Sequence, residues 1–405
     1  MNGPLDGLKV FDLTRILAGP HCTQILGDLG AEIIKIERPG MGDDTRNFAP
    51  PYLRDENGDD SAESAYFAGT NRNKRSITLN LSDPEGQALA RRLIARSDVL
   101  VENFKTGTLA KYGLGFDDLH GEFPRLIYCS ITGFGQTGPY ASRPGYDALI
   151  QAMGGVMSLT GEPDGTPMKI GVSIADMMSG MYAGMSILAA VRHQQITGEG
   201  QHIDISMLDT HVAWLANQGM SFLATGEVPE RLGNNHPSIV PYQVMPSADG
   251  HFVLSVGNDP TFERFCAVAG CAQLLEDERF RTAPERVRNR DHVTEVLNAI
   301  TGAKPSAWWL AELEKAKIGC APINDLAQVF DDPQVKAREM VIEMDHRATG
   351  KAPAKLIASP IKMSGTPVTY RQAPPTLGQH TEEMLKELLD ISAGEVAALR
   401  EKGVV

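Results

Sequence analysis

Asp176 is the side chain of this sequence whose setting best suits a covalent nucleophile. It is a lone carboxylate in Gly171-Val-Ser-Ile-Ala-Asp-Met-Met-Ser-Gly180, among small and apolar residues where a long helix is expected to begin. A carboxylate can attack an activated acyl group, and donors at a helix N-terminus can keep it ionised and stabilise developing negative charge. The flanking glycines would leave room for a bulky thioester. The alternative for a lone aspartate here is a helix N-cap.

Three other segments could bind a ligand, and each has a structural alternative. Arg38 follows the second expected strand and could clamp an anion, or it could close a strand–loop junction. Glu102-Asn-Phe104 ends a further strand and could present an amide and an aromatic face to a base, or it could cap a loop. Gly145-Tyr-Asp147 opens a helix, where Asp147 would complement the helix dipole.

Neither a catalytic triad nor a metal motif accompanies these residues in the sequence. The 10 histidines are scattered, and His-Glu-x-x-His spacing does not occur among them. The 5 cysteines are odd in number and lack Cys-x-x-Cys spacing, which argues against a disulfide framework or a zinc site. We therefore expect no metal site, and a metal hydrolase is not supported.

The elements that must position these residues alternate between strand and helix over roughly the first two hundred positions. Strands are predicted at residues 8–13, 32–37, 76–81, 99–102, 126–131 and 201–206, and helices at 22–29, 83–96 and 176–195. This alternation predicts an α/β fold with a doubly wound, mostly parallel, Rossmann-like sheet. Its first strand–helix turn reads Ala18-Gly-Pro20 in place of Gly-x-Gly-x-x-Gly, so an ordinary NAD enzyme is disfavoured.

A change of character near residue 226 predicts a second, smaller α+β domain. A polar, proline-bounded connector at 234–243 leads into a hairpin signal around Ala248-Asp-Gly250. We expect a large domain over residues 1–200, completed by 370–405, a linker helix over 201–225, the small domain over 226–335 and a return linker over 336–369.

The overall charge and hydropathy restrict the partners of the chain. Its formal net charge is −13, which argues against nucleic acid and anionic membranes, since both attract basic surface. The sequence has no uninterrupted apolar stretch near the ~18 residues that a membrane helix needs, and Met1-Asn-Gly-Pro-Leu does not begin a signal peptide. We expect a cytoplasmic protein that binds neither nucleic acid nor membrane.

Nine ordered motifs give the chain a resemblance to one family from Pro4 to its end. They are Ala18-Gly-Pro20, Lys35-Ile-Glu-Arg38, Gly42-Asp-Asp-Thr-Arg46, Asn73-Lys-Arg-Ser-Ile77, Val101-Glu-Asn-Phe104, Gly145-Tyr-Asp147, the segment 171–180, Val240-Pro-Tyr-Gln243 and Leu377-Gly-Gln-His-Thr381. The chain resembles the class III CoA-transferases, the family that includes formyl-CoA transferase and carnitine CoA-transferase. The resemblance implies a homodimer of two chains threaded through each other as interlocked rings.

The resemblance also implies an activity and a site. The aspartate at the Asp176 position would accept the acyl group and then carry CoA, which moves from an acyl-CoA donor to a carboxylic acid. CoA and acyl-CoA would be substrates, with no permanently bound cofactor. Residues implied in the CoA site are Ile16, Ala18, Arg38, Leu79, Asn103, Phe104, Lys111 and Tyr146.

Within the family, the chain resembles most the dicarboxylate branch, typified by succinyl-CoA:glutarate CoA-transferase. The branch implies succinyl-CoA as donor and a short dicarboxylic acid as acceptor, whose distal carboxylate needs a cation. Candidates for that cation are Arg46, Arg72 and His236.

Two departures from formyl-CoA transferase disfavour oxalate and formate as substrates. Leu17 replaces a glutamine, and the stretch 241–250 lacks a glycine-rich gating loop. The Asn234-Asn-His-Pro loop is then our candidate for the segment that excludes water.

Two alternative functions stay open at this point. A 2-methylacyl-CoA racemase of the same superfamily would carry a histidine where this chain has Tyr146, and tyrosine is a poor base at neutral pH. The other alternative is a catalytically silent CoA-binding protein in which Asp176 is only a cap.

Overall fold

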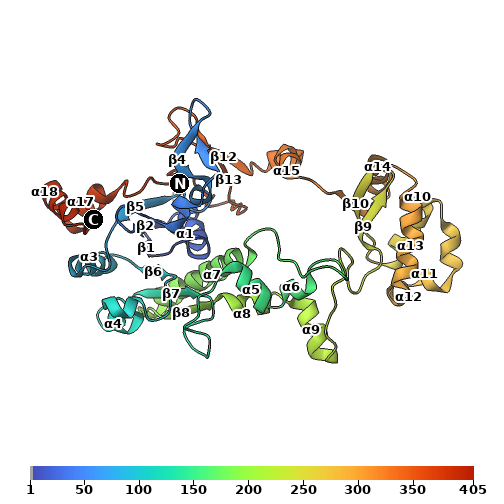
Figure 1. Ribbon diagram of the computed structural model, residues 1–405, viewed down its shortest axis with the longest axis horizontal. Helices are drawn as coiled ribbons and strands as arrows, with labels where there is room; N and C mark the ends of the chain where they lie inside the picture. Colours follow the sequence, from blue (N-terminus) through green and yellow to red (C-terminus); the bar gives the residue numbers. More distant parts are fainter. Residues whose placement is uncertain (1–2) are drawn as a thin grey trace. The chain divides into compact units, whose positions relative to one another are not determined.

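The structure is a computed structural model that describes residues 3–405. The chain divides into two units, and each is described by itself (Figure 1). Unit 1 comprises Met1–Gly155, Ile170–Met220 and Lys336–Val405, and unit 2 comprises Val156–Lys169 and Ser221–Val335. The C-terminal segment thus belongs to the same unit as the N-terminal half of the chain.

Unit 1 is built on a six-stranded parallel sheet, as the alternation of strands and helices predicts. Its strands run in the order β5-β2-β1-β6-β7-β8. Their bounds are Lys9–Asp12 (β1), Glu32–Glu37 (β2), Lys74–Thr78 (β5), Val99–Glu102 (β6), Ile127–Thr132 (β7) and His202–Ser206 (β8). The strand order reverses between β1 and β6, and open α/β sheets bind ligands beyond the carboxyl ends of the strands at such a point.

Helices cover both faces of this sheet. α1 (Ala18–Asp28) and α7 (Ile174–Thr197) pack on one face, and α3 (Pro84–Ile94) packs on the other with the two C-terminal helices. Neighbouring strand residues alternate between the two cores, so that Val10 belongs to the first and Phe11 to the second. Strands covered on both faces carry consecutive apolar residues, as Val10-Phe11 of β1 and Ile33-Ile34 of β2 do.

The remaining elements of unit 1 are short. They are β3 (Tyr52–Arg54), β4 (Asp60–Ser64), α2 (Ala65–Ala68), α4 (Phe116–His120), α5 (Asp147–Met153), α8 (Met207–Ala213), β12 (Val341–Met344), β13 (Ala354–Ile357), α17 (Thr381–Leu389), α18 (Ala393–Glu401) and 3₁₀ turns at Asp44–Asn47 and Leu109–Tyr112. β3–β4 and β12–β13 are antiparallel hairpins that the sequence did not predict.

Two expected linkers contain regular structure. The strand predicted at 201–206 is confirmed as the edge strand β8, and the rest of the segment 201–225, expected as a linker helix, forms α8 and α9 (Ala216–Thr225). The segment 336–369, expected as a return linker, includes the β12–β13 hairpin and lies in unit 1. Strand pairing, which composition alone does not reveal, accounts for the unpredicted β12–β13 hairpin.

Unit 2 has a three-stranded antiparallel sheet in the order β11-β10-β9, with its own apolar core. The strands are Tyr242–Ser247 (β9), Gly250–Ser255 (β10) and Gly319–Pro322 (β11), so the predicted hairpin is confirmed. Its helices are α6 (Val156–Leu159), α10 (Asp259–Ala269), α11 (Glu278–Arg281), α12 (Ala283–Arg288), α13 (Arg290–Thr301), α14 (Ser306–Lys315) and α15 (Leu326–Asp331), with a 3₁₀ turn at Ala272–Glu276; α16 (Pro333–Ala337) follows at the return to unit 1.

One described helix, α7, is long and apolar enough to cross a membrane by length and composition alone. Of its most apolar window, 44% is buried within the protein, and the helix packs against α1 and contributes to the core of unit 1. Core helices of globular proteins pass the same test. The sequence interpretation looked only for uninterrupted apolar residues and therefore did not single out this helix.

Candidate active site

An open hollow with about 1350 Å³ of empty space lies at the carboxyl ends of β1, β6 and β7 in unit 1. Asp176 lines it, together with residues from the first turns of α1, α5 and α8. Of the residues that the sequence and the resemblance point to, the hollow brings together Ile16, Ala18, Asn103, Phe104, Tyr146 and Asp176. These side chains are up to 160 positions apart in the sequence, and the parallel sheet unites them at one edge.

Asp176 is the third residue of α7, and it does not cap that helix. The cap is supplied by Asp147 of α5, whose Oδ1 accepts a hydrogen bond from the backbone N–H of Ala175 at 2.8 Å. The other oxygen of Asp147 accepts from Gln151 at 2.7 Å. Because Asp147 performs the capping function, the Asp176 carboxylate is available to the hollow.

Close backbone contacts explain two of the glycines near this site, Gly180 and Gly145, whereas a Cβ on Gly171 would meet open space. A Cβ on Gly180 would lie 2.5 Å from the carbonyl oxygen of Ala18, so α1 and α7 can approach only with glycine there. A Cβ on Gly145 would lie 2.3 Å from the Cα of Gly133 at the end of β7. These contacts hold the starts of α1, α5 and α7 around the hollow.

The surroundings of Asp176 weaken its acidity. Burial raises the pKa of this carboxyl to about 7, and the neighbouring negative charge of Asp147 adds to the shift. The first backbone N–H groups of α1 and α7 lack acceptors within their own helices, so both helix ends present partial positive charge near the hollow. Asp176 is therefore harder to ionise than an exposed aspartate, although both helix ends can stabilise negative charge in the hollow.

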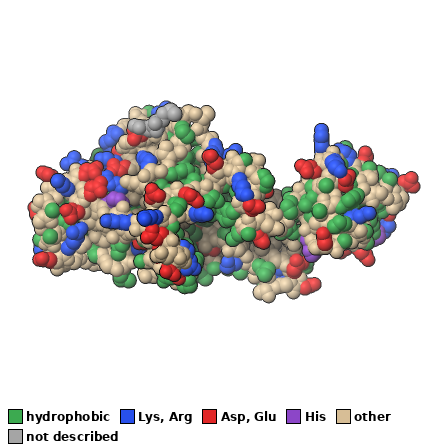
Figure 2. Space-filling view, turned by 90° about the horizontal axis from the view of Figure 1, so that it is seen from above, with side chains coloured by type: hydrophobic (Ala, Val, Ile, Leu, Met, Phe, Trp, Pro, Cys, Tyr) green, Lys and Arg blue, Asp and Glu red, His purple; other side chains and the backbone are tan. Residues whose placement is uncertain are grey.

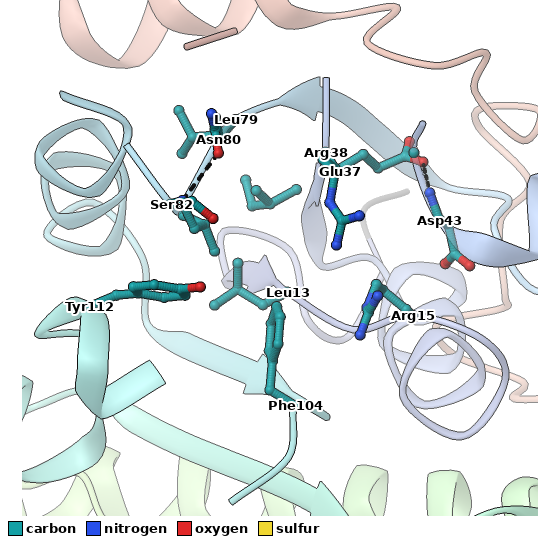
Figure 3. A pocket seen from close by; sticks show the side chains of 13 residues that line it. Leu13, Arg15, Glu37, Arg38, Asp43, Leu79, Asn80, Ser82, Phe104 and Tyr112 are labelled. Atoms are coloured by element: carbon teal, nitrogen blue, oxygen red, sulfur yellow. Dashed lines mark hydrogen bonds between the residues drawn. The ribbon is translucent and has the colours of Figure 1, made fainter. Parts of the chain in front are cut away.

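A second pocket opens between β1, β2 and β5 at the same edge of the sheet (Figure 3). Arg15 and Arg38 extend into it from one side, and Leu79, Phe104 and Tyr112 line it from the others. Arg15 and Phe104 line both this pocket and the hollow that contains Asp176. The two neighbouring cavities, here called the path, thus share Arg15 between them, with Arg38 in one and Asp176 in the other.

Several lining residues were not predicted from the sequence. Arg15, held by Asp44 at 2.9 Å, and Arg143, whose guanidinium lies 3.9 Å from the centre of the Tyr140 ring, both line the hollow. Arg15 follows β1 and Arg143 precedes Gly145-Tyr-Asp147, so each stands beside a motif that was noticed. Lys111 is exposed and outside the lining of both cavities, and its neighbour Tyr112 lines the pocket instead.

The cations suggested for an acceptor carboxylate have other partners. Arg46 contacts Glu37 at 2.7 Å and Glu63 at 2.9 Å and lies over the Phe67 ring. Arg72 is held by Asp28 at 2.6 Å. These buried ion pairs favour structural roles. His236 lies in unit 2, with its ring 5.2 Å from that of Tyr242.

A fully buried charge cluster supports the loop after β1. Lys74 contacts Asp12 at 3.2 Å and Lys35 contacts Asp43 at 2.9 Å, and all four side chains are inaccessible or nearly so. Asp43 also accepts from the backbone N–H of Ile16 at 3.2 Å. Ile16 has a φ of 70°, which is strained for a β-branched residue, so the cluster stabilises an unfavourable backbone at the edge of the hollow.

The fold and this carboxylate-lined path define a CoA-transferase of family III. The model of CoA-transferase family III matches residues 5–381, and the chain belongs to this family. It is 46% identical to the succinate–glutarate CoA-transferase of Agrobacterium fabrum over 385 residues, 95% of this chain and 96% of that one. It is 41% identical to the succinyl-CoA:glutarate CoA-transferase of Mus musculus over 402 residues, 99% of this chain and 90% of that one.

The solved structures agree with this assignment. The crystal structure of a CAIB/BAIF family protein from Brucella suis is similar with a TM-score of 0.84 and 47% sequence identity, covering 96% of this chain and 100% of that one. The expected family and the main parallel sheet are therefore confirmed.

Proposed function

We propose that this protein transfers CoA from succinyl-CoA to a short dicarboxylic acid through the carboxylate of Asp176, as a cytoplasmic enzyme. The observation that carries the proposal is the Asp176 carboxylate, which does not cap α7 and lines a hollow that shares Arg15 with the neighbouring pocket of Arg38. The names of the relatives support the choice of succinyl-CoA and a dicarboxylate.

The two cavities suit the two ends of a CoA thioester. The nucleotide would occupy the pocket of Arg38, Leu79 and Phe104, where two guanidinium groups can pair with its phosphates. The thioester would lie in the hollow beside Ile16, Ala18 and Tyr146. Asn103 lines the hollow, but both ends of its amide bind the backbone of Arg15, so we assign it a supporting role.

The carboxyl group of Asp176 takes part in each of the four steps of the proposed reaction. Asp176 attacks the succinyl-CoA carbonyl, the C–S bond breaks, and a mixed anhydride and CoA thiolate form. The thiolate attacks the aspartyl carbonyl of the anhydride and releases succinate, which leaves an aspartyl-CoA thioester. The acceptor carboxylate attacks this thioester to form a second anhydride, and the thiolate then takes the acyl group. The helix N-termini of α1 and α7 would stabilise the oxyanions of each step.

We also propose that the protein acts as an interlocked homodimer. The exposed side of α7 carries Met181, Met185 and Leu188 with 43%, 53% and 37% of their surfaces exposed. Figure 2 shows hydrophobic side chains interspersed with charged ones on the face that it presents. Apolar helix faces of this kind are typical of subunit interfaces. Light scattering is expected to give about twice the 43.8 kDa mass of the chain, and a monomer would contradict the proposal.

Arg143 is our candidate for the cation that binds the distal carboxylate of the acceptor. It lines the same hollow as Asp176, and its guanidinium is stacked on Tyr140 rather than placed in an ion pair within the described residues 3–405. We expect Arg143→Gln to raise the KM for dicarboxylates about 10- to 100-fold, since a charge-assisted hydrogen bond contributes about 1.5–3 kcal/mol. Arg143→Lys should restore part of this loss. An equal rise of KM for monocarboxylic acceptors would contradict the assignment.

The proposed function is tested by offering succinyl-CoA with a panel of mono- and dicarboxylic acids and identifying new acyl-CoA species by mass spectrometry. A dicarboxyl-CoA product supports the proposal and names the acceptor. Solvent deuterium at Cα of a 2-methylacyl-CoA, without transfer, would assign the protein to the racemase alternative. CoA binding without either reaction would leave a silent CoA-binding protein.

A further inference from the structure

The loop at residues 103–106 separates the CoA path from a third cavity. Lys105 and Thr106 line both the hollow of Asp176 and this third cavity, which has about 910 Å³ of empty space. Phe104, on the same loop, lines the hollow and the nucleotide pocket. The position of this short loop therefore determines the shape of the CoA site along its whole length.

A row of three side chains, here called the file, lies at the base of this loop. It consists of Glu102, Ser130 and His202. Glu102 ends β6 and its Oε2 accepts from the backbone N–H of Phe104 at 2.8 Å. Ser130 is the register partner of Glu102 on β7 and lowers the pKa of that carboxyl. The Ser130 hydroxyl lies 3.0 Å from Nε2 of His202 on β8. Glu102 and Ser130 are only 5% and 2% exposed, so the file connects three neighbouring strand ends beneath the surface.

Asn103 of this loop is hydrogen-bonded to Arg15, which lines the CoA path. The Asn103 Oδ1 accepts from the backbone N–H of Arg15 at 2.9 Å, and its Nδ2 donates to the Arg15 carbonyl at 2.7 Å. Arg15 lines both CoA cavities and its guanidinium lies 5.2 Å from the centre of the Phe104 ring. A shift of the loop therefore moves an anion-binding side chain.

We propose that Glu102, Ser130 and His202 are positioning residues for CoA, and that their file has two complete hydrogen-bond arrangements that hold the loop with different strength. The proposal rests on the CoA binding proposed above. None of the three residues is placed against the substrate itself, since they act through the Asn103–Phe104 loop.

The two arrangements differ by one proton. With Glu102 ionised, its carboxylate accepts from Phe104 N–H and from the Ser130 hydroxyl, and Ser130 accepts from Nε2–H of His202. With Glu102 protonated, its O–H donates to Ser130, Ser130 donates to Nε2, and the imidazole proton resides on Nδ1. The ionised form binds Phe104 N–H more strongly, because hydrogen bonds to charged acceptors are about twice as strong as neutral ones.

The surroundings of Glu102 bring the change between the two arrangements near neutral pH. Burial raises the pKa of Glu102 to about 7, and the negative charge of Asp204 on β8 adds to the shift. Burial lowers the pKa of His202, which Asp204 and Asp117 partly oppose, and this favours the neutral ring that both arrangements contain. The other titratable groups that face the file are Lys105, Asp118, Tyr128 and the buried thiol of Cys129.

Phe116 provides a matched control within the structure. Its ring is stacked between two histidines, His202 at 4.9 Å and His120 at 4.8 Å between ring centres. Of the two, His202 alone reaches Ser130. A substitution of His120 therefore alters the same aromatic stack without altering the file.

The test measures binding of dephospho-CoA by calorimetry at pH 6 and pH 8. This probe lacks the terminal phosphate, whose own titration near pH 6 would obscure the effect. The wild-type Kd is expected to be about three- to tenfold lower at pH 8, where Glu102 is ionised. Glu102→Gln should remove this difference and bind as the wild type does at pH 6. Asp176 titrates alike in both proteins, so their comparison isolates Glu102.

The histidine variants test the remainder of the file. His202→Phe should weaken binding at both pH values, His202→Gln should recover most of it, and His120→Phe should leave it unchanged. An unaltered pH dependence in Glu102→Gln, or equal effects of the two phenylalanine variants, overturns the proposal. A wild type that does not bind dephospho-CoA or CoA at all would instead overturn the proposed function.

Discussion

Asp176→Asn should lower kcat for CoA transfer by at least about a thousandfold, because an amide is a poor nucleophile and cannot form the mixed anhydride. The folded protein should be nearly as stable as the wild type. The reason is structural: the cap of α7 comes from Asp147, which this substitution leaves in place. Initial rates with succinyl-CoA, together with thermal unfolding, measure both effects.

The same carboxylate should govern the pH dependence of the reaction. The pKa of Asp176 is raised to about 7, first by burial and then by Asp147. The ionised form is the nucleophile. We therefore expect kcat to be low below pH 7, where the carboxyl is protonated, and to increase as the pH rises through about 7.

Asp147→Asn is the matched comparison for this nucleophile, since its amide oxygen can still accept from Ala175 N–H while the negative charge beside Asp176 is removed. It should retain activity and shift the pH profile to lower values. Activity of Asp176→Asn within tenfold of the wild type would contradict the covalent mechanism.

Asp12→Ala should lower the free energy of unfolding by about 3–5 kcal/mol, the usual cost of leaving a buried charge without its partner. Asp12 lies 3.2 Å from Lys74, and both side chains are fully inaccessible. Burial opposes ionisation of Asp12, but Lys74 and Lys35 outweigh it and hold the pKa of that carboxyl below its usual value. Urea unfolding followed by circular dichroism measures the loss.

Two further variants make this stability prediction specific. Removing both charges in Asp12→Ala/Lys74→Met should recover much of the stability, because replacing a whole buried pair by apolar groups is often neutral. Removing Glu312, which pairs with the exposed Lys315 in unit 2, should cost at most about 1 kcal/mol. Equal losses in Asp12→Ala and in the surface variant would show that the buried cluster contributes little.

The arrangement of the main sheet was predictable because local patterns determine it. The centres of β1 and β2 are apolar on both faces, and α3 (Pro84–Ile94) lies within the predicted helix range 83–96. The β3–β4 and β12–β13 hairpins were missed because their strands have only 3 to 5 residues each, too few for a hydrophobic repeat to be recognised. Sequence patterns report burial, and they fail where a strand is stabilised chiefly by its pairing.

The candidate site was only partly predictable, since side-chain partners are a tertiary property. The family resemblance supplied Asp176, and every CoA-site residue that it implied except Lys111 lines one of the two cavities. The sequence did not reveal that Arg46 and Arg72 are committed to buried carboxylates, or that the Asn103 amide is bound to Arg15. Arg143 was overlooked because an isolated arginine in a loop has no pattern that distinguishes it from a surface residue.

The Asp147 cap joins parts of the site that would otherwise move separately. Tyr146 precedes Asp147 at the start of α5, Gly145 is pressed against Gly133, and Asp147 fixes the first turn of α7. Tyr146 and the nucleophile Asp176 are thus held to each other through Asp147, and the Gly145–Gly133 contact holds both to the end of β7. A substrate that displaced Tyr146 would also tilt the carboxylate it is meant to meet, so a misfitting acyl group would be selected against by reactivity as well as by affinity.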